Sequence, residues 1–227
     1  MRQERAIRTR RAILDAAASV FDERGYEAAT IGEVLARAGV TKGALYFHFP
    51  SKQALAEGVL SEQFADVRLS PRASKLQELV DMGLALAHRM CHDPLVSASA
   101  RLSLGQEMGE LFGTRGITGW IETTEQVLRE AKEQGELLPH VEPGESAWIM
   151  SAAWTGVQVY SQTLSGRRDL AERVASLFEH LLPSIAVPAV LNKLVYGPER
   201  AEQVAREGAR LAADARKEEE EELRASA

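Results

Sequence analysis

Residues 30–52 read TIGEVLARAGVTKGALYFHFPSK, and this stretch decides the fold. Thr30, with Glu33 three residues later, forms a capping box that starts a short helix, and Gly39 ends that helix. A second short helix is expected over residues 41–47, directly after a tight turn. Ser51 then caps a longer helix that is expected to end near residue 68. Two short helices joined by a glycine-containing turn are typical of a helix-turn-helix unit.

An amphipathic helix over residues 5–24 precedes this stretch and completes a three-helix unit. We expect Gly25 to end it. A core this small is marginal without a neighbouring element to pack against. The predicted core of the unit consists of Leu14, Phe21, Val34, Leu35, Val40, Leu45 and Phe49.

The rest of the chain has helical periodicity and few strand signals, so the predicted fold class is all-α. Candidate helices of a bundle cover residues 73–91, 95–108, 117–134, 144–164, 170–182 and 188–215. Gly197-Pro198 interrupts the last of these, which is therefore two helices or one kinked helix. We expect a helix-turn-helix domain over 1–52, a helical domain over 53–216, and a disordered acidic tail over 217–227 with five consecutive glutamates.

Charge is distributed unevenly along the chain. The formal net charge is −6, yet residues 1–52 contain nine Lys and Arg against six Asp and Glu. This basic end confines attraction for a polyanion to the first domain. The single cysteine excludes an internal disulfide, and neither a signal peptide nor an apolar run of membrane length is evident, so the expected location is the cytoplasm.

The helix over 41–47 combines small residues with hydrogen-bond donors on one side. Gly43 permits close approach to a major groove, and Lys42 can reach base edges or phosphate. The Tyr46 hydroxyl and His48 ring can donate to phosphate, and Lys52 adds charge in the first turn of the next helix. The alternative is a plain amphipathic helix with solvated charges. That alternative explains poorly a glycine within a short helix, which costs stability.

These residues resemble the DNA-binding domain of TetR-family repressors, over about the first quarter of the chain. The resemblance implies an all-helical homodimer that binds palindromic operator DNA and releases it when a ligand enters the C-terminal domain. An arginine-rich N-terminal arm that includes Arg8 could follow the DNA backbone or enter a minor groove. Carried over by position, Lys42 and Gly43 would contact bases, and Thr30, Tyr46, His48 and Lys52 would contact phosphates. The predicted DNA-binding residues are Arg8, Thr30, Thr41, Lys42, Gly43, Tyr46, His48 and Lys52.

A narrower resemblance is to bacterial γ-butyrolactone receptors, which sense diffusible lactone or butenolide autoregulators in quorum sensing and control secondary metabolism. It rests on residues 44–49, on Trp120 and on the run Trp154-Thr155-Gly156-Val157-Gln158. It implies that Trp120 lines the pocket and that Thr155 bonds the ligand. The predicted ligand-binding residues are Trp120, Thr124, Thr155, Gln158 and Val159.

The helix over 144–164 also suggests a pocket from its own pattern. Trp148, Thr155 and Val159 fall on one side, giving an apolar wall with a polar group. A core helix whose Thr155 bonds its own backbone is an equally good interpretation of that residue. Ala153, Gly156 and Tyr160 form another face, which we assign to dimer contacts together with the helix over 170–182.

Other functions have weaker support in the sequence. The effector could instead be another apolar molecule, such as an antibiotic or a lipid. His88, Cys91 and His92 have the spacing of metal ligands, but an ordinary helix end is the better interpretation, and no metal or cofactor is predicted. No nucleophile elbow, zinc-protease or nucleotide-binding motif is present, so no catalytic residue is predicted and an enzyme is not expected.

Overall fold

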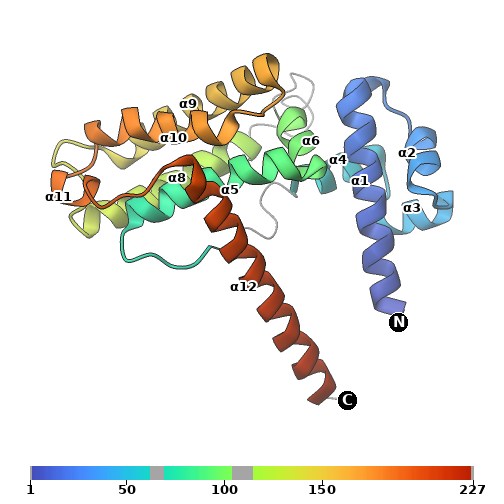
Figure 1. Ribbon diagram of the computed structural model, residues 1–227. Coiled ribbons are helices and arrows are strands. Elements are labelled where there is room, and N and C mark those ends of the chain that lie inside the picture. The colour runs from blue at the N-terminus through green and yellow to red at the C-terminus, as the bar shows by residue number, and fades with distance from the viewer. Residues whose placement is uncertain (1, 62–68, 104–114, 226–227) are drawn as a thin grey trace. The chain divides into compact units, whose positions relative to one another are not determined.

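The computed structural model describes residues 2–61, 69–103 and 115–225, and the described part consists of helices joined by turns (Figure 1). The predicted all-α fold class is confirmed. The chain forms two compact units, one of residues 1–65 and 92–117 and the other of residues 66–91 and 118–227. In the part described, no helix is long and apolar enough to cross a membrane.

The first unit contains five helices among the described residues: α1 (Arg2–Ala28), α2 (Ile31–Ala38), α3 (Lys42–His48), α4 (Lys52–Ser61) and α6 (Pro94–Ser103). The residues predicted for its core are all buried or packed against it. Helix α6 adds Leu95, Ala98 and Leu102 to this core. A small helix-turn-helix needs such a neighbour, because it buries too little surface by itself. The unit that packs together therefore extends beyond residue 52.

The local signals at the helix ends have the predicted geometry. The Glu33 N–H donates to the Thr30 hydroxyl at 3.2 Å, and the Thr30 N–H donates to the Glu33 carboxylate at 2.9 Å. The Thr30 hydroxyl also donates to that carboxylate at 2.9 Å, and the two hydrogen bonds that the carboxylate accepts from Thr30 lower the pKa of Glu33. Gly39 ends α2 in the left-handed region with φ 65°. Gly25 has φ 76° and ψ 168°, so the regular helix is broken there as predicted, and a further helical stretch continues α1 to Ala28.

The second unit is a bundle of α5 (Lys75–His92), α8 (Arg115–Glu133), α9 (Pro143–Ser165) and α10 (Leu170–Leu181), followed by shorter elements. Helices α9 and α10 lie side by side in Figure 1, joined through Gly166, which has φ 63°. A short 3₁₀ turn η1 (Leu182–Ser184) and α11 (Pro188–Leu191) lead to the last helix, α12 (Pro198–Ala225).

The sequence left two interpretations of residues 188–215 open, and the structure has two separate helices there, because Pro198 begins α12 instead of lying within it. Helix α12 then continues to Ala225, through most of the segment that we expected to be a disordered tail. Glutamate, leucine, arginine and alanine all have high helix propensity, which favours this continuation. Parts of the predicted helices, residues 62–68 and 104–108, lie outside the described residues.

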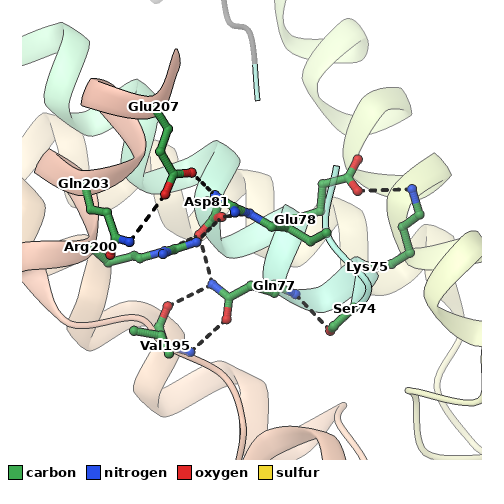
Figure 2. Close-up of polar contacts among 10 residues, drawn as sticks. Ser74, Lys75, Gln77, Glu78, Asp81, Val195, Arg200, Gln203 and Glu207 are labelled. Carbon is green, nitrogen blue, oxygen red and sulfur yellow. Dashed lines mark hydrogen bonds and ion pairs between the residues drawn. The ribbon is translucent and has the colours of Figure 1, made fainter. Parts of the chain in front are cut away.

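A buried carboxylate joins α12 to α5 (Figure 2). Asp81 is 1% exposed and accepts hydrogen bonds from Gln77, Arg72 and Arg200, the two arginines approaching to 2.7 Å. Arg72 also pairs with Glu207 on α12, and the Gln77 amide bonds both backbone groups of Val195. A buried charge without such partners would cost several kcal/mol, about 3–5 by the effect of removing one partner. This cluster therefore fixes the start of α12 on the bundle.

Candidate functional site

Two buried side chains pack the inner side of helix α3 against the core of the first unit. Leu45 and Phe49 lie in the core of the first unit. Thr41 caps the helix, because its hydroxyl accepts from the Ala44 N–H at 3.2 Å. Gly58 of α4 passes so close that a Cβ there would lie 2.7 Å from the Phe49 ring. This packing sets the rotation of α3 and turns its remaining side chains outward.

The outer face of α3 brings together four of the predicted DNA-binding residues. Thr41, Lys42 and Gly43 are exposed, and Tyr46 is 40% exposed. The Lys42 ammonium lies 5.8 Å from the centroid of the Tyr46 ring. One cation and one hydroxyl thus stand beside a glycine at which a Cβ would meet nothing within 4 Å. A surface with donors and no obstruction can approach a groove of DNA closely.

Three of the other predicted residues make contacts within the first unit. The Lys52 ammonium donates to the Glu27 carbonyl at 3.0 Å and lies 4.5 Å from the Tyr26 ring. Its charge remains at the surface, but its position is set by these contacts. His48 is half-buried, with its ring against that of Phe47. Thr30 is exposed and serves as the cap of α2.

The N-terminal arginines lie on helix α1, which begins a few residues before the predicted start at residue 5. Helix α1 begins at Arg2, and both Arg5 and Arg8 are exposed on it. Arg11 instead pairs with Asp15 at 3.0 Å and with Asp93 at 3.3 Å. The arginines therefore differ, since Arg8 presents its charge to solvent and Arg11 is partly neutralised by carboxylates.

Sequence reasoning gave no role to Phe47, which is the most exposed large apolar residue on α3. Its side chain is 81% exposed, although Phe49 two residues later is buried. The period of a helix places residue 47 between the inner positions 45 and 49 and away from the core. The sequence therefore already indicated that Phe47 is exposed beside Tyr46 and His48, although it assigned Phe47 no role.

The predicted ligand-binding residues lie on α8 and α9 with different degrees of burial. Thr124 and Gln158 are buried, whereas Trp120 and Thr155 are half-buried. Gln158 accepts a hydrogen bond at 3.2 Å from Arg167, which is itself buried. Val159 is 39% exposed, so the structure places it apart from the inward side of α9. That inward side consists of Ala147, Met150, Gln158 and Ser161.

The side of α9 on which we expected a pocket wall faces outward at both ends in this chain. Trp148 and Val159 are exposed, while Thr155 between them is half-buried. The reason is that α9 carries apolar residues all round, so its sequence pattern does not determine which side packs inward. Among the predicted residues on α9, Gln158 is therefore buried, Thr155 is half-buried and Val159 is exposed.

The face assigned to dimer contacts is an open groove between α9 and α10. It is about 580 Å³ in volume and mostly apolar. Tyr160 and Leu164 are 71% and 78% exposed, and Gly156 lies in the groove wall without any atom near the position of a Cβ. At one end, Asp169 pairs with Arg173 at 2.9 Å and accepts from the Ser161 and Ser165 hydroxyls. These hydrogen bonds lower the pKa of Asp169.

The described residues show little sign of metal or thiol chemistry. Over residues 2–61, 69–103 and 115–225, no group of three or more His, Cys, Asp and Glu side chains could hold a metal ion. Burial raises the pKa of the Cys91 thiol, and its Sγ lies 3.3 Å from the Arg167 carbonyl oxygen. A raised pKa disfavours the thiolate that a redox sensor requires.

Known proteins match this chain in both its helix-turn-helix and its helical bundle. Residues 13–59 match the family model described as bacterial regulatory proteins, tetR family. The chain is 43% identical to the A-factor receptor protein of Streptomyces griseus, over 95% of this chain and 80% of the relative. A crystal structure of tylp, a tetr regulator from Streptomyces fradiae, has a TM-score of 0.81 at 45% identity, covering 92% of this chain and 94% of that one.

A further solved structure, a gamma-butyrolactone receptor described as ArpA-like, has a TM-score of 0.65 at 28% identity and covers 92% of this chain and 99% of its own. These matches include the bundle as well as the helix-turn-helix. Such regulators bind DNA and are not enzymes. The chain therefore belongs to the TetR family of bacterial regulatory proteins and is a ligand-responsive transcriptional repressor of that family.

Proposed function

We propose that this repressor binds palindromic operator DNA as a homodimer and releases it when a γ-butyrolactone or butenolide binds the second unit. The similarity to the A-factor receptor carries this proposal, because it spans 95% of the chain and so includes the bundle. The likeness to a gamma-butyrolactone receptor over 92% of the chain supports the same class of ligand. A DNA-binding function also implies that the protein works in the bacterial cytoplasm.

The proposed DNA surface is the outer face of α3 with the neighbouring cations. Lys42 and Gly43 would approach base edges, and Thr41 and Tyr46 would contact phosphates from the same helix. Thr30, His48, Lys52 and Arg8 would add phosphate contacts around it. Half-sites one helical turn apart, roughly 34–36 Å, would suit two copies of α3 in a dimer.

The proposed dimer contact is the apolar groove between α9 and α10. Gly156 supports this assignment, since its own chain leaves the space above it open. A glycine within a helix costs about 1 kcal/mol relative to alanine. Close crossing of a helix from a second copy at this point would explain why the residue is glycine. The second copy would also cover Tyr160 and Leu164.

Ligand release then follows from linked equilibria. We propose that Trp120, Thr124, Thr155, Gln158 and Val159 contribute to a ligand site, with Thr155 as a hydrogen-bonding group. A ligand that prefers a dimer whose α3 helices no longer match the groove spacing lowers the population that binds DNA. In this proposal residues 1–52 bind DNA, and residues 53–216 bind the ligand and the second subunit.

The test begins with an operator that the protein selects for itself from a pool of random duplexes. Mobility shift on that operator is then measured with a γ-butyrolactone, a butenolide, a fatty acid and a hydrophobic antibiotic. We expect the lactone or butenolide to release the operator at concentrations at which the other two do not. Release by the antibiotic or the fatty acid alone would favour the second candidate, a TetR-type repressor of another apolar effector.

A matched pair of variants on α9 tests the ligand site. Thr155→Val should keep operator affinity and require about tenfold more lactone for release, the equivalent of one hydrogen bond of about 1.4 kcal/mol. Thr163→Val makes the same change at an exposed threonine whose hydroxyl bonds the Val159 carbonyl, and it should behave as the wild type. If the two variants require the same lactone concentration for release, Thr155 does not contribute to the ligand site. A ligand that binds, as shown by thermal shift, yet leaves operator affinity unchanged would contradict the release mechanism.

A further inference from the structure

The ring of Phe47 is exposed at a point where the fold gains nothing from it. Burying a phenylalanine side chain typically contributes about 1.5–3 kcal/mol, and Phe21 and Phe49 of the same unit are both buried. Phe47 is 81% exposed, and its ring meets the edge of the His48 ring at a centroid distance of 5.1 Å and an angle of 82°. This contact orients the ring without removing it from solvent.

Gly43 lies one helical turn before Phe47 on the same strip of α3. Side chains four residues apart are neighbours on a helix. Because Gly43 has no side chain, the helix surface next to the Phe47 ring is a shallow depression with the backbone accessible. Gly43 has no positive φ, and a Cβ there would meet no atom within 4 Å. The fold of the chain therefore requires neither the glycine nor the exposed ring. An external partner that approaches the α3 backbone closely would explain both.

The charges around this strip indicate the chemistry of the partner. Lys42 and Tyr46 flank it, and the Lys42 ammonium lies within 5.8 Å of the Tyr46 ring centroid. A cation and a hydroxyl beside an apolar ring suit a polyanion that also presents an apolar group. In the major groove, the C5-methyl of thymine is that group, and it distinguishes thymine from the other bases.

We propose that Phe47 is a specificity-determining residue, whose ring packs on the methyl group of one thymine in each operator half-site while Gly43 lets the helix approach. The ring has no donor or acceptor, so it would read the base by contact alone. This inference uses the DNA binding of the family and is independent of the proposed effector.

The experiment is a double-mutant cycle on the self-selected operator. Each thymine of a half-site is replaced in turn by deoxyuridine, which removes the methyl group and preserves base pairing. Phe47→Ala should weaken operator binding by about tenfold, within the range of a good base contact. One deoxyuridine position should weaken binding of the wild type several-fold and have no effect on Phe47→Ala. Lys42→Ala is the control, because it should still show the full deoxyuridine penalty.

Other outcomes would overturn the proposal. Operator affinity of Phe47→Ala equal to that of the wild type would show that the ring makes no contact of consequence. A loss for Phe47→Ala without coupling to any thymine would place the ring against deoxyribose instead. A change in oligomeric state by light scattering would show that the ring belongs to a contact between protein chains. Circular dichroism on Phe47→Ala checks that the variant folds, and Phe47→Leu should retain part of the thymine coupling.

Discussion

Two surfaces of this protein expose large apolar side chains, and they differ in the charge around them. The strip on α3 exposes Phe47 next to Lys42, in a domain whose first 52 residues are net basic. The groove between α9 and α10 exposes Tyr160 and Leu164, and there Asp169 and Arg173 neutralise each other. Both surfaces contain a helical glycine that its own chain does not need. On both surfaces we expect the glycine to permit close approach of a partner, which the surrounding charge suggests is DNA at the basic strip and a second subunit at the groove.

The largest effect should come from placing charge in the groove. Leu164→Glu puts a carboxylate in a surface that we expect to be covered by the second subunit, so the protein should become monomeric. Operator affinity should then fall by about 10²- to 10⁴-fold, because two linked half-site contacts become one. Light scattering and mobility shift measure the two consequences. A dimeric Leu164→Glu with normal operator affinity would contradict the assignment of the groove.

A smaller effect should come from removing the cation of the α3 strip. Lys42→Ala should weaken operator binding by about tenfold, and the slope of log affinity against log salt should change by less than the value of about 1 that the loss of a phosphate contact gives, because we assign Lys42 to base edges. The dimer should be unchanged, in contrast to Leu164→Glu. Fluorescence anisotropy over a series of salt concentrations gives both numbers. Lys193→Ala, at an exposed lysine of the other unit, is the matched control and should leave the slope as it is.

Exchanging the glycines should separate folding from binding. Gly43→Ala and Gly156→Ala should each stabilise the fold by about 0.4–1 kcal/mol, because alanine favours the helix and its Cβ meets nothing. The first should weaken DNA binding and the second should weaken dimerisation, each by a few-fold. Gly58→Ala should instead destabilise the protein, since its Cβ would lie 2.7 Å from Phe49. The free energy of unfolding of each variant is measured by chemical denaturation. Equal changes in all three variants would contradict this account.

The smallest effect concerns pH at the end of the groove. The pKa of Asp169 is lowered by the Ser161, Ser165 and Arg173 hydrogen bonds, so its contribution to stability is present above the unfolded pKa of about 3.9. That contribution is lost as the pH falls through the lower, folded value. Asp169→Asn should therefore show a shallower loss of unfolding free energy on acidification below about pH 4. Parallel curves for the wild type and Asp169→Asn would show that the carboxylate has no such role.

Local signals made the first unit predictable from sequence. Thr30, Glu33 and Gly39 act within a few residues of themselves, and the structure has the predicted capping box and left-handed glycine. The buried positions Leu45 and Phe49 also followed from helical spacing. The contribution of α6 to the same core was not foreseen, because it depends on residues more than 40 positions further along the chain.

The second unit was less predictable, for a physical reason that α9 illustrates. Its apolar residues surround the helix, so the periodicity could not show that Val159 is exposed while Gln158 is buried. The partner of Gln158 is Arg167, whose backbone takes a positive φ of 66° that no propensity of arginine would suggest. The DNA-binding and ligand-binding roles of individual residues remain predictions, since they depend on partners that the chain itself does not contain.

The buried Asp81 cluster affects the order in which the protein can be made. Its carboxylate lies near the start of the bundle, but Arg200 and Glu207 are synthesised more than a hundred residues later. A nascent chain can complete the first unit as soon as residue 117 leaves the ribosome, whereas the bundle must wait for α12. A chain that stops short of Arg200 would leave Asp81 with one arginine fewer. A chain whose translation ends early would thus have a defective bundle. If such a fragment occupied an operator, it would not respond to a signal, so its removal by proteolysis would protect regulation.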